Sequence, residues 1–110
     1  MRAPLSVIIP TLNAAGSLPA CLASLIEGLE AGILREVVVC DGGSDDATLE
    51  IAEAAGARVV TTAPSRGGQL MAGAEASAGD WMLFLHADTV LESGWSGVVR
   101  DHLSRKDAGY

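Results

Sequence analysis

Short apolar runs alternate with longer amphipathic stretches along the whole chain. Four of the runs are continuous and rich in Val, Ile and Leu, as in strands that are buried on both faces. We expect strands at residues 5–10, 36–40, 58–62 and 81–85. Apolar residues recur at helical spacing over the intervals that follow them, at about residues 17–31, 44–56, 65–78 and 93–103. The predicted order is therefore strict alternation of strand and helix.

Polar residues and glycines mark the ends of the predicted helices. Ser17 and Ser65 can cap the first and third helices, and Ser44 or Asp45 can open the second. Glycines stand where three of the helices should end, at Gly32, Gly56 and Gly79. Apolar strands joined by helices predict one α/β domain, with a parallel sheet and helices on both faces. The aromatic and apolar residues of the fourth run, 81–84, are expected in the core, and Trp95 in the core or at its edge.

Composition and charge narrow the possible partners. The chain has 110 residues, of which 49% are hydrophobic, and its formal net charge is −7. Seven Lys and Arg residues cannot form the basic face that nucleic acid requires, so we expect no nucleic-acid partner. An acidic protein can still bind a small diphosphate where a metal ion or a helix N-terminus supplies positive charge.

The two cysteines and the hydropathy of the sequence indicate in which cellular compartment the protein is expected. Cys21 and Cys40 lie in apolar patterns and are expected to be free thiols in a reducing compartment. The sequence shows neither a signal peptide nor an apolar run long enough to span a membrane. We expect a cytoplasmic protein, which would be peripheral at the inner membrane face if it meets the membrane at all.

Polar residues gather where each predicted strand ends. Parallel strands end at the same edge of a sheet, so these residues should converge on one crevice. The candidate binding residues in these clusters are Pro10, Thr11 and Asn13 at the first strand, Asp41, Gly43 and Ser44 at the second, Arg66 and Gln69 after the third, and His86, Ala87 and Asp88 after the fourth.

Each of these residues also has a plain structural interpretation. Asp41 is either a turn former or an acceptor for a base N–H or a sugar hydroxyl. Arg66, at a glycine-rich helix start, either binds a diphosphate or faces solvent. Gln69 either contacts the same ligand or lies on the helix surface. Asp88 either offers the hard carboxylate oxygen that Mg²⁺ or Mn²⁺ prefers or caps a turn. In the second case His86 is a histidine at the rim of the crevice with no ligand to bind.

Three segments in register carry a family likeness. Residues 6–13, 38–48 and 79–88 resemble the family 2 glycosyltransferases in order and spacing, and residues 65–71 and 85–89 resemble a bacterial subgroup of that family. The resemblance implies the Rossmann-like GT-A fold, that of the nucleotide-diphospho-sugar transferases. By contrast, the first turn has no dinucleotide-binding glycine fingerprint, and the chain has no P-loop.

The resemblance also implies roles for individual residues. Thr11, Asn13 and Asp41 would hold the base and ribose, with Arg66 near the base or phosphate. His86 stands where the first aspartate of the family's Asp-x-Asp motif would be. Asp88 keeps the place of the metal-binding aspartate, which implies Mn²⁺ or Mg²⁺ as cofactor.

The implied reaction is metal-assisted transfer of a sugar from a UDP-sugar to an unknown acceptor hydroxyl, with inversion. The family's general base is expected beyond Tyr110. Residues 1–110 would therefore be the donor-binding half of the domain, with an incomplete sheet that can self-associate, and without the acceptor half. The alternative is a non-catalytic nucleotide-binding or assembly module.

Overall fold

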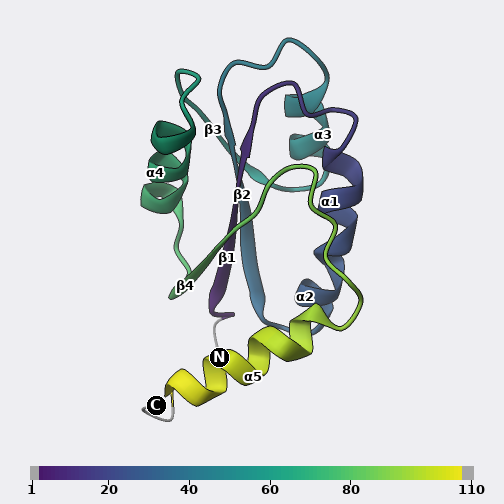
Figure 1. The fold of residues 1–110 in the computed structure, drawn as a ribbon, viewed down its shortest axis with the longest axis vertical. Helices are drawn as coiled ribbons and strands as arrows, with labels where there is room; N and C mark the ends of the chain where they lie inside the picture. The colour runs from purple at the N-terminus through teal and green to yellow at the C-terminus, as the bar shows by residue number, and fades with distance from the viewer. Residues whose placement is uncertain (1–2, 108–110) are drawn as a thin grey trace.

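A four-stranded parallel sheet forms the centre of the computed structural model, which describes residues 3–107. Its strands are β1 (Leu5–Thr11), β2 (Leu34–Asp41), β3 (Arg58–Thr61) and β4 (Trp81–Phe84). They lie in the order β3-β2-β1-β4, and every neighbouring pair is parallel. The carboxyl ends of all four strands therefore share one edge of the sheet, as the sequence predicts (Figure 1).

Helices cover both faces of this sheet. They are α1 (Leu18–Ser24), α2 (Ile26–Glu30), α3 (Thr48–Ala54), α4 (Arg66–Ala76) and α5 (Trp95–Asp107). Helices α1, α2 and α3 lie on one face and α4 on the other, while α5 crosses the end of the sheet at which β1 and β2 begin (Figure 1). The predicted α/β architecture is confirmed.

The strands divide their side chains between two apolar layers. Val7, Ile9 and Val39 are fully buried on the face that packs against α1 and α2. On the other face, Ile8 and Val38 form a smaller cluster that packs beneath α4. Alternate strand residues point to opposite faces, so burial on both faces requires the continuous apolar runs seen in the sequence.

The first predicted helix, 17–31, is interrupted at Leu25. The indole Nε1 of Trp95 donates to the carbonyl of Ser24 (2.8 Å), which would otherwise accept from the fourth residue along. The N–H of Gly28 donates to Leu25 O instead (3.0 Å). Ser17 does not cap this helix with its side chain, because its hydroxyl donates back to the carbonyl of Ala14 (3.4 Å). Both features were missed because the partner atoms lie outside the helix.

The second helix begins at Thr48, later than the predicted start at Ser44 or Asp45. Both of those residues bond to other loops at the sheet edge, and Asp46 accepts the N–H of Thr48 through Oδ1 (3.0 Å). The third helix begins as predicted, because Ser65 Oγ accepts from the N–H of Gly68 (3.3 Å). It ends at Ala76, two residues early, and α5 covers 95–107 in place of the predicted 93–103.

One apolar strand is only half covered. Met82 and Phe84 are each 47% exposed, so the expectation that they lie in the core is wrong. Both side chains lie on the same face of the sheet as α4, but that helix packs over β1 and β2. Within residues 3–107, β4 is an edge strand. Trp81 and Leu83, on the other face, do pack against the main core, and Trp95 is buried.

Two further expectations concern the thiols and membrane spans. Cys21 and Cys40 are both buried and free, as predicted. Burial raises the pKa of the Cys40 thiol to about 11, which keeps it in the unreactive thiol form at neutral pH. No helix within residues 3–107 has the length and apolar character needed to cross a bilayer.

Candidate functional site

A polar hollow of about 270 Å³ lies between the carboxyl ends of β1 and β4. It is formed by two segments that come from neighbouring strands, the loop after β1 and the loop after β4. Its lining includes six of the residues singled out in the sequence: Pro10, Thr11, Asn13, His86, Ala87 and Asp88. Sequence reasoning missed three more lining residues, which carry no distinctive chemistry apart from the Ser17 hydroxyl: Leu12, Ala14 and Ser17.

Asp41 lies beneath this hollow and has no exposed surface. Its Oδ1 accepts from the hydroxyls of Thr11 (2.7 Å) and Ser44 (2.6 Å), and its Oδ2 accepts from the N–H groups of Gly43 (3.0 Å) and Ser44 (2.8 Å). Burial alone would raise the pKa of this carboxyl, but hydrogen bonds from Ser44, Thr11 and Gly43 outweigh burial and lower it. Asp41 is therefore a buried carboxylate that joins the ends of β1 and β2.

Asn13 links the same two loops from the outside. It is the one non-glycine residue among 3–107 with a positive φ, at 52°, a conformation that Asn tolerates better than most residues. Its Oδ1 accepts from the N–H of Asp45 (2.7 Å), and its own N–H donates to Ser44 Oγ (2.8 Å). The strained backbone therefore serves a specific pairing of two loops, and it leaves Asn13 exposed at the hollow.

Two residues that the sequence analysis did not single out complete this pairing. Asp46 Oδ2 accepts from the N–H of Ala15 (3.1 Å), and Thr48 Oγ1 accepts from the N–H of Ala14 (2.9 Å). Asp46 and Thr48 also bond to each other. The run of acidic and hydroxyl residues at 44–48 was the available signal, since such side chains bond readily to nearby backbone.

His86 and Asp88 line the hollow, and Arg66 contacts His86. The guanidinium Nη2 of Arg66 contacts the imidazole of His86, and His86 Nδ1 lies 3.9 Å from Asp88 Oδ1. The side chains of His86 and Asp88 are 60% and 77% exposed. These three polar side chains converge from α4 and from the loop after β4, and they remain open to a ligand.

Gln69 and Gly43, like Asp41, Ser44 and Arg66, do not line the hollow. Gln69 is 6% exposed, so the alternative that it is helix surface is wrong, and its amide bonds to the backbone of neighbouring loops. Gly43 has a φ of 102° and bonds to Asp41 through its N–H. Both residues support the loops that form the hollow.

Comparison with known proteins agrees with this arrangement. The family model described as "Glycosyl transferase family 2" matches residues 6–110, which is nearly the whole chain. The chain belongs to glycosyltransferase family 2.

Proteins similar to this chain include mycobacterial glycosyltransferases. The chain is 41% identical over 99 residues to a "PGL/p-HBAD biosynthesis glycosyltransferase" of Mycobacterium bovis (strain BCG / Pasteur 1173P2), covering 83% of this chain and 38% of that protein. It is 33% identical over 95 residues to the glucosyl-3-phosphoglycerate synthase of Mycobacterium tuberculosis (strain ATCC 25618 / H37Rv), covering 78% of this chain and 29% of that protein. The chain thus spans well under half the length of these relatives.

A solved mycobacterial structure has the same fold. The crystal structure of the Mycobacterium tuberculosis glucosyl-3-phosphoglycerate synthase in complex with Mn²⁺ and UDP-glucose matches with a TM-score of 0.70 and 31% identity. The match covers 79% of this chain and 34% of that chain. The predicted GT-A, Rossmann-like fold is confirmed.

The residues of this family 2 chain fit a metal ion only in part. Among residues 3–107, no group of three or more His, Cys, Asp or Glu side chains is arranged to hold an ion. Asp88 offers an exposed carboxylate at the hollow, which suits a hard cation whose remaining ligands are phosphate oxygens and water. The donor set therefore fits a metal that arrives together with a diphosphate.

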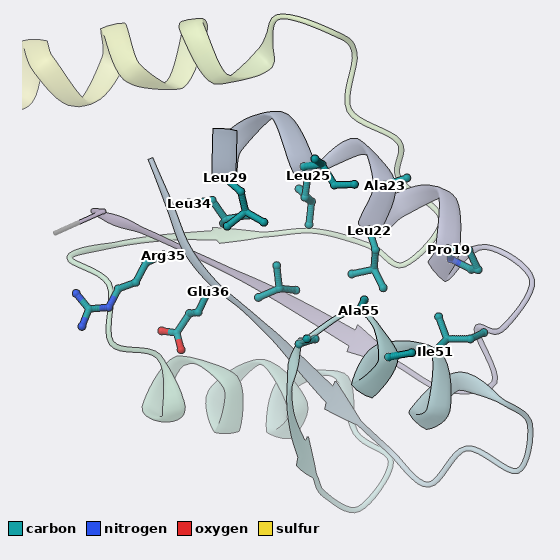
Figure 2. Close-up of a pocket in the computed structure, with 15 residues that line it drawn as sticks. Pro19, Leu22, Ala23, Leu25, Leu29, Leu34, Arg35, Glu36, Ile51 and Ala55 are labelled. Carbon is teal, nitrogen blue, oxygen red and sulfur yellow. The ribbon is translucent and has the colours of Figure 1, made fainter. Parts of the chain in front are cut away.

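A larger hollow, of about 630 Å³, lies elsewhere on this family 2 domain. Figure 2 shows aliphatic side chains of α1, α2 and α3 facing one another across it, with Arg35 and Glu36 at one end. None of the site residues predicted from the sequence lines it. Its chemistry is that of an uncovered apolar groove, in contrast to the smaller, polar hollow between β1 and β4.

Proposed function

We propose that this chain binds the nucleoside diphosphate of a nucleotide sugar, UDP-sugar being the expected donor, in the hollow between the ends of β1 and β4. The observation that carries the proposal is the contact of Arg66 with His86, which lines that hollow together with Asp88. The UDP and Mn²⁺ complexes of the similar mycobacterial synthase support this choice of ligand. Residues 1–110 would then act as the donor-binding part of the GT-A domain.

Each residue of the site has a distinct task in this proposal. Thr11 and Asn13 would hold the base and ribose from the loop after β1, with Asp41 keeping that loop in place or accepting directly after the Ser44 hydroxyl rotates away. Arg66 would pair with phosphate oxygens through its guanidinium. His86 would donate to or accept from a ribose hydroxyl.

Asp88 would hold Mn²⁺ or Mg²⁺ through a carboxylate oxygen. When bound, the metal supplies Lewis-acid stabilisation of the negative charge on the departing diphosphate. In the proposed reaction an acceptor hydroxyl forms a bond to the anomeric carbon while the bond from that carbon to the diphosphate oxygen breaks, with inversion. The hydroxyl proton passes to a general base that we have not matched to any residue of this sequence.

Calorimetric titration of UDP into the parent chain, with and without Mn²⁺, tests the site. A single carboxylate should bind Mn²⁺ weakly, and UDP supplies the missing oxygens, so each ligand should strengthen binding of the other by the same factor. Asp88→Asn should remove the Mn²⁺ enhancement and retain metal-free UDP binding. His86→Ala should weaken UDP binding in both conditions, and Asp41→Ala should weaken it at least several-fold.

Matched controls separate site effects from general ones. Asp80→Asn removes an exposed aspartate just before β4, at the opposite end of that strand from Asp88, and should leave UDP and Mn²⁺ binding unchanged. An Asp88→Asn variant that keeps the full Mn²⁺ enhancement would show that the metal role is assigned wrongly. Unchanged UDP affinity in Asp41→Ala would remove Asp41 from the site.

The alternative is a nucleotide-binding or assembly module without catalysis. An assay for hydrolysis of UDP-glucose distinguishes the two functions, since a catalytic chain should release glucose slowly in an Mn²⁺-dependent manner. Tight binding of UDP without any turnover would favour the module.

A further inference from the structure

Gln69 is a buried amide that ties the start of α4 to the carboxyl ends of β1 and β2. Its Nε2 donates to the carbonyl of Thr11 (2.9 Å), at the end of β1, and to the carbonyl of Cys40 (2.8 Å), near the end of β2. Its Oε1 accepts from the N–H of Ser65 (3.2 Å), directly before α4. Both donors and the acceptor of this one side chain are therefore engaged.

The bond to Ser65 fixes the turn that carries Arg66. Ser65 also caps α4, since its hydroxyl accepts from the N–H of Gly68 (3.3 Å). Arg66 follows directly, and its guanidinium is exposed and reaches the imidazole of His86 at the hollow. Because no burial holds the arginine side chain, its direction depends on the backbone from which it leaves.

The chemistry of the amide suits this task. A glutamate of the same shape has no donors at neutral pH and would place negative charge against two carbonyl oxygens. Methionine has similar length but would leave the Ser65 N–H without its acceptor and both carbonyls without a donor from α4. Of the three side chains, only the amide bonds to Ser65 and to both strand ends. The position of the start of α4 relative to β1 therefore depends on it.

We propose that Gln69 is a positioning residue, which does not touch the nucleotide but anchors the Ser65–Arg66 turn to the ends of β1 and β2 so that Arg66 meets the diphosphate. This inference rests on the proposed nucleotide binding at the hollow. It replaces the direct nucleotide contact expected of Gln69 from the sequence, because the side chain is buried, with 6% exposed, and both of its N–H donors are already engaged within the chain.

A double-mutant cycle on UDP affinity in the presence of Mn²⁺ tests the inference. The four proteins are the parent, Arg66→Ala, Gln69→Met and the double variant. Each single substitution should weaken UDP binding roughly tenfold to a hundredfold, the range for losing one hydrogen bond to a charged group. The double variant should bind no more weakly than Arg66→Ala alone, because both changes remove the same contact.

Losses that multiply in the double variant would overturn the inference, since Gln69 would then act independently of Arg66. Unchanged UDP affinity in Gln69→Met would overturn it as well. Glu75→Met is the matched control, because it places the same residue on an exposed position of α4, and it should bind UDP like the parent. A parent chain that binds no UDP would defeat the proposed function itself, and the inference with it.

A second variant covers the case in which Gln69→Met fails to fold. A Cβ at Gly42 would lie 3.0 Å from Gln69 Oε1 and 3.1 Å from Pro64 Cα, so Gly42→Ala presses on the amide while keeping every donor and acceptor. It should weaken UDP binding to a smaller extent in the parent and have no effect in the Arg66→Ala background. An equal loss in both backgrounds would contradict the positioning role.

Discussion

The carboxylate of Asp41 combines full burial with ionisation. Four hydrogen bonds from hydroxyl and N–H donors compensate for the loss of water, and they bind the charged form more strongly than the neutral one. The pKa of Asp46 is also lowered, chiefly by the hydroxyl of Thr48. These carboxylates hold the loops at the sheet edge together, so the site and the stability of the domain share the same residues.

We therefore expect acid to destabilise the domain. A carboxyl whose pKa is lower in the folded than in the unfolded state contributes stability above its unfolded pKa, about 3.9 for Asp. That contribution is lost as the pH falls through the lower folded-state pKa. Urea unfolding should give a smaller free energy at pH 3 than at pH 7. Asp41→Asn should have a smaller free energy of unfolding than the parent at pH 7, and that free energy should fall less between pH 7 and pH 3. An equal fall in the variant and the parent would contradict this account.

At the scale of elements, helix α4 packs unusually close to the sheet. A Cβ built on Gly73 would lie 2.3 Å from the Sγ of Cys40 and 2.5 Å from a methyl of Ile8. Both neighbours are fully buried in the sheet, so neither can move away without disturbing it. Glycine is required here for close approach, although it is a poor helix former.

Gly73→Ala should accordingly destabilise the domain by about 1–3 kcal/mol, the usual range for overpacking a core. Gly67→Ala, on the same helix, is the control, because within residues 3–107 no heavy atom beyond its chain neighbours and its own helix backbone lies within 4 Å of its Cβ position. That change should be neutral or stabilise by up to about 1 kcal/mol. Thermal unfolding of the two variants side by side measures the difference, and equal melting temperatures would contradict close packing at Gly73.

The elements differ in how far they could be predicted from the sequence. The strands were predictable because burial on both faces requires continuous apolar runs, and the residues at their carboxyl ends had to share an edge. The break at Leu25 was not, because it depends on the indole of Trp95, seventy-odd residues away in sequence. The buried position of Gln69 was missed for a similar reason, since helical spacing alone does not show which partners lie nearby.

At the scale of the whole molecule, the exposure of β4 was the main error. An apolar run predicts a buried strand, but it does not show whether a neighbour covers each face. Met82 and Phe84 lie on the same face of the sheet as α4, but the helix does not cover them. Within residues 3–107, β4 pairs with another strand on one side only. An uncovered apolar edge strand is a ready site for pairing with another chain.

We expect the isolated chain to self-associate through the β4 edge. Pairing of two β4 strands would satisfy their free backbone groups and bury Met82 and Phe84 of both copies. The net charge of −7 on each copy opposes this contact, so association measured by light scattering should strengthen as added salt screens the repulsion.

Phe84→Lys should reduce association even though it lowers the net negative charge, because it places a charge at the apolar contact. Leu29→Lys is the control, since Leu29 is 59% exposed on α2, over the opposite face of the sheet. A monomer at high concentration and high salt would contradict the prediction, and equal losses in the two lysine variants would move the contact away from β4.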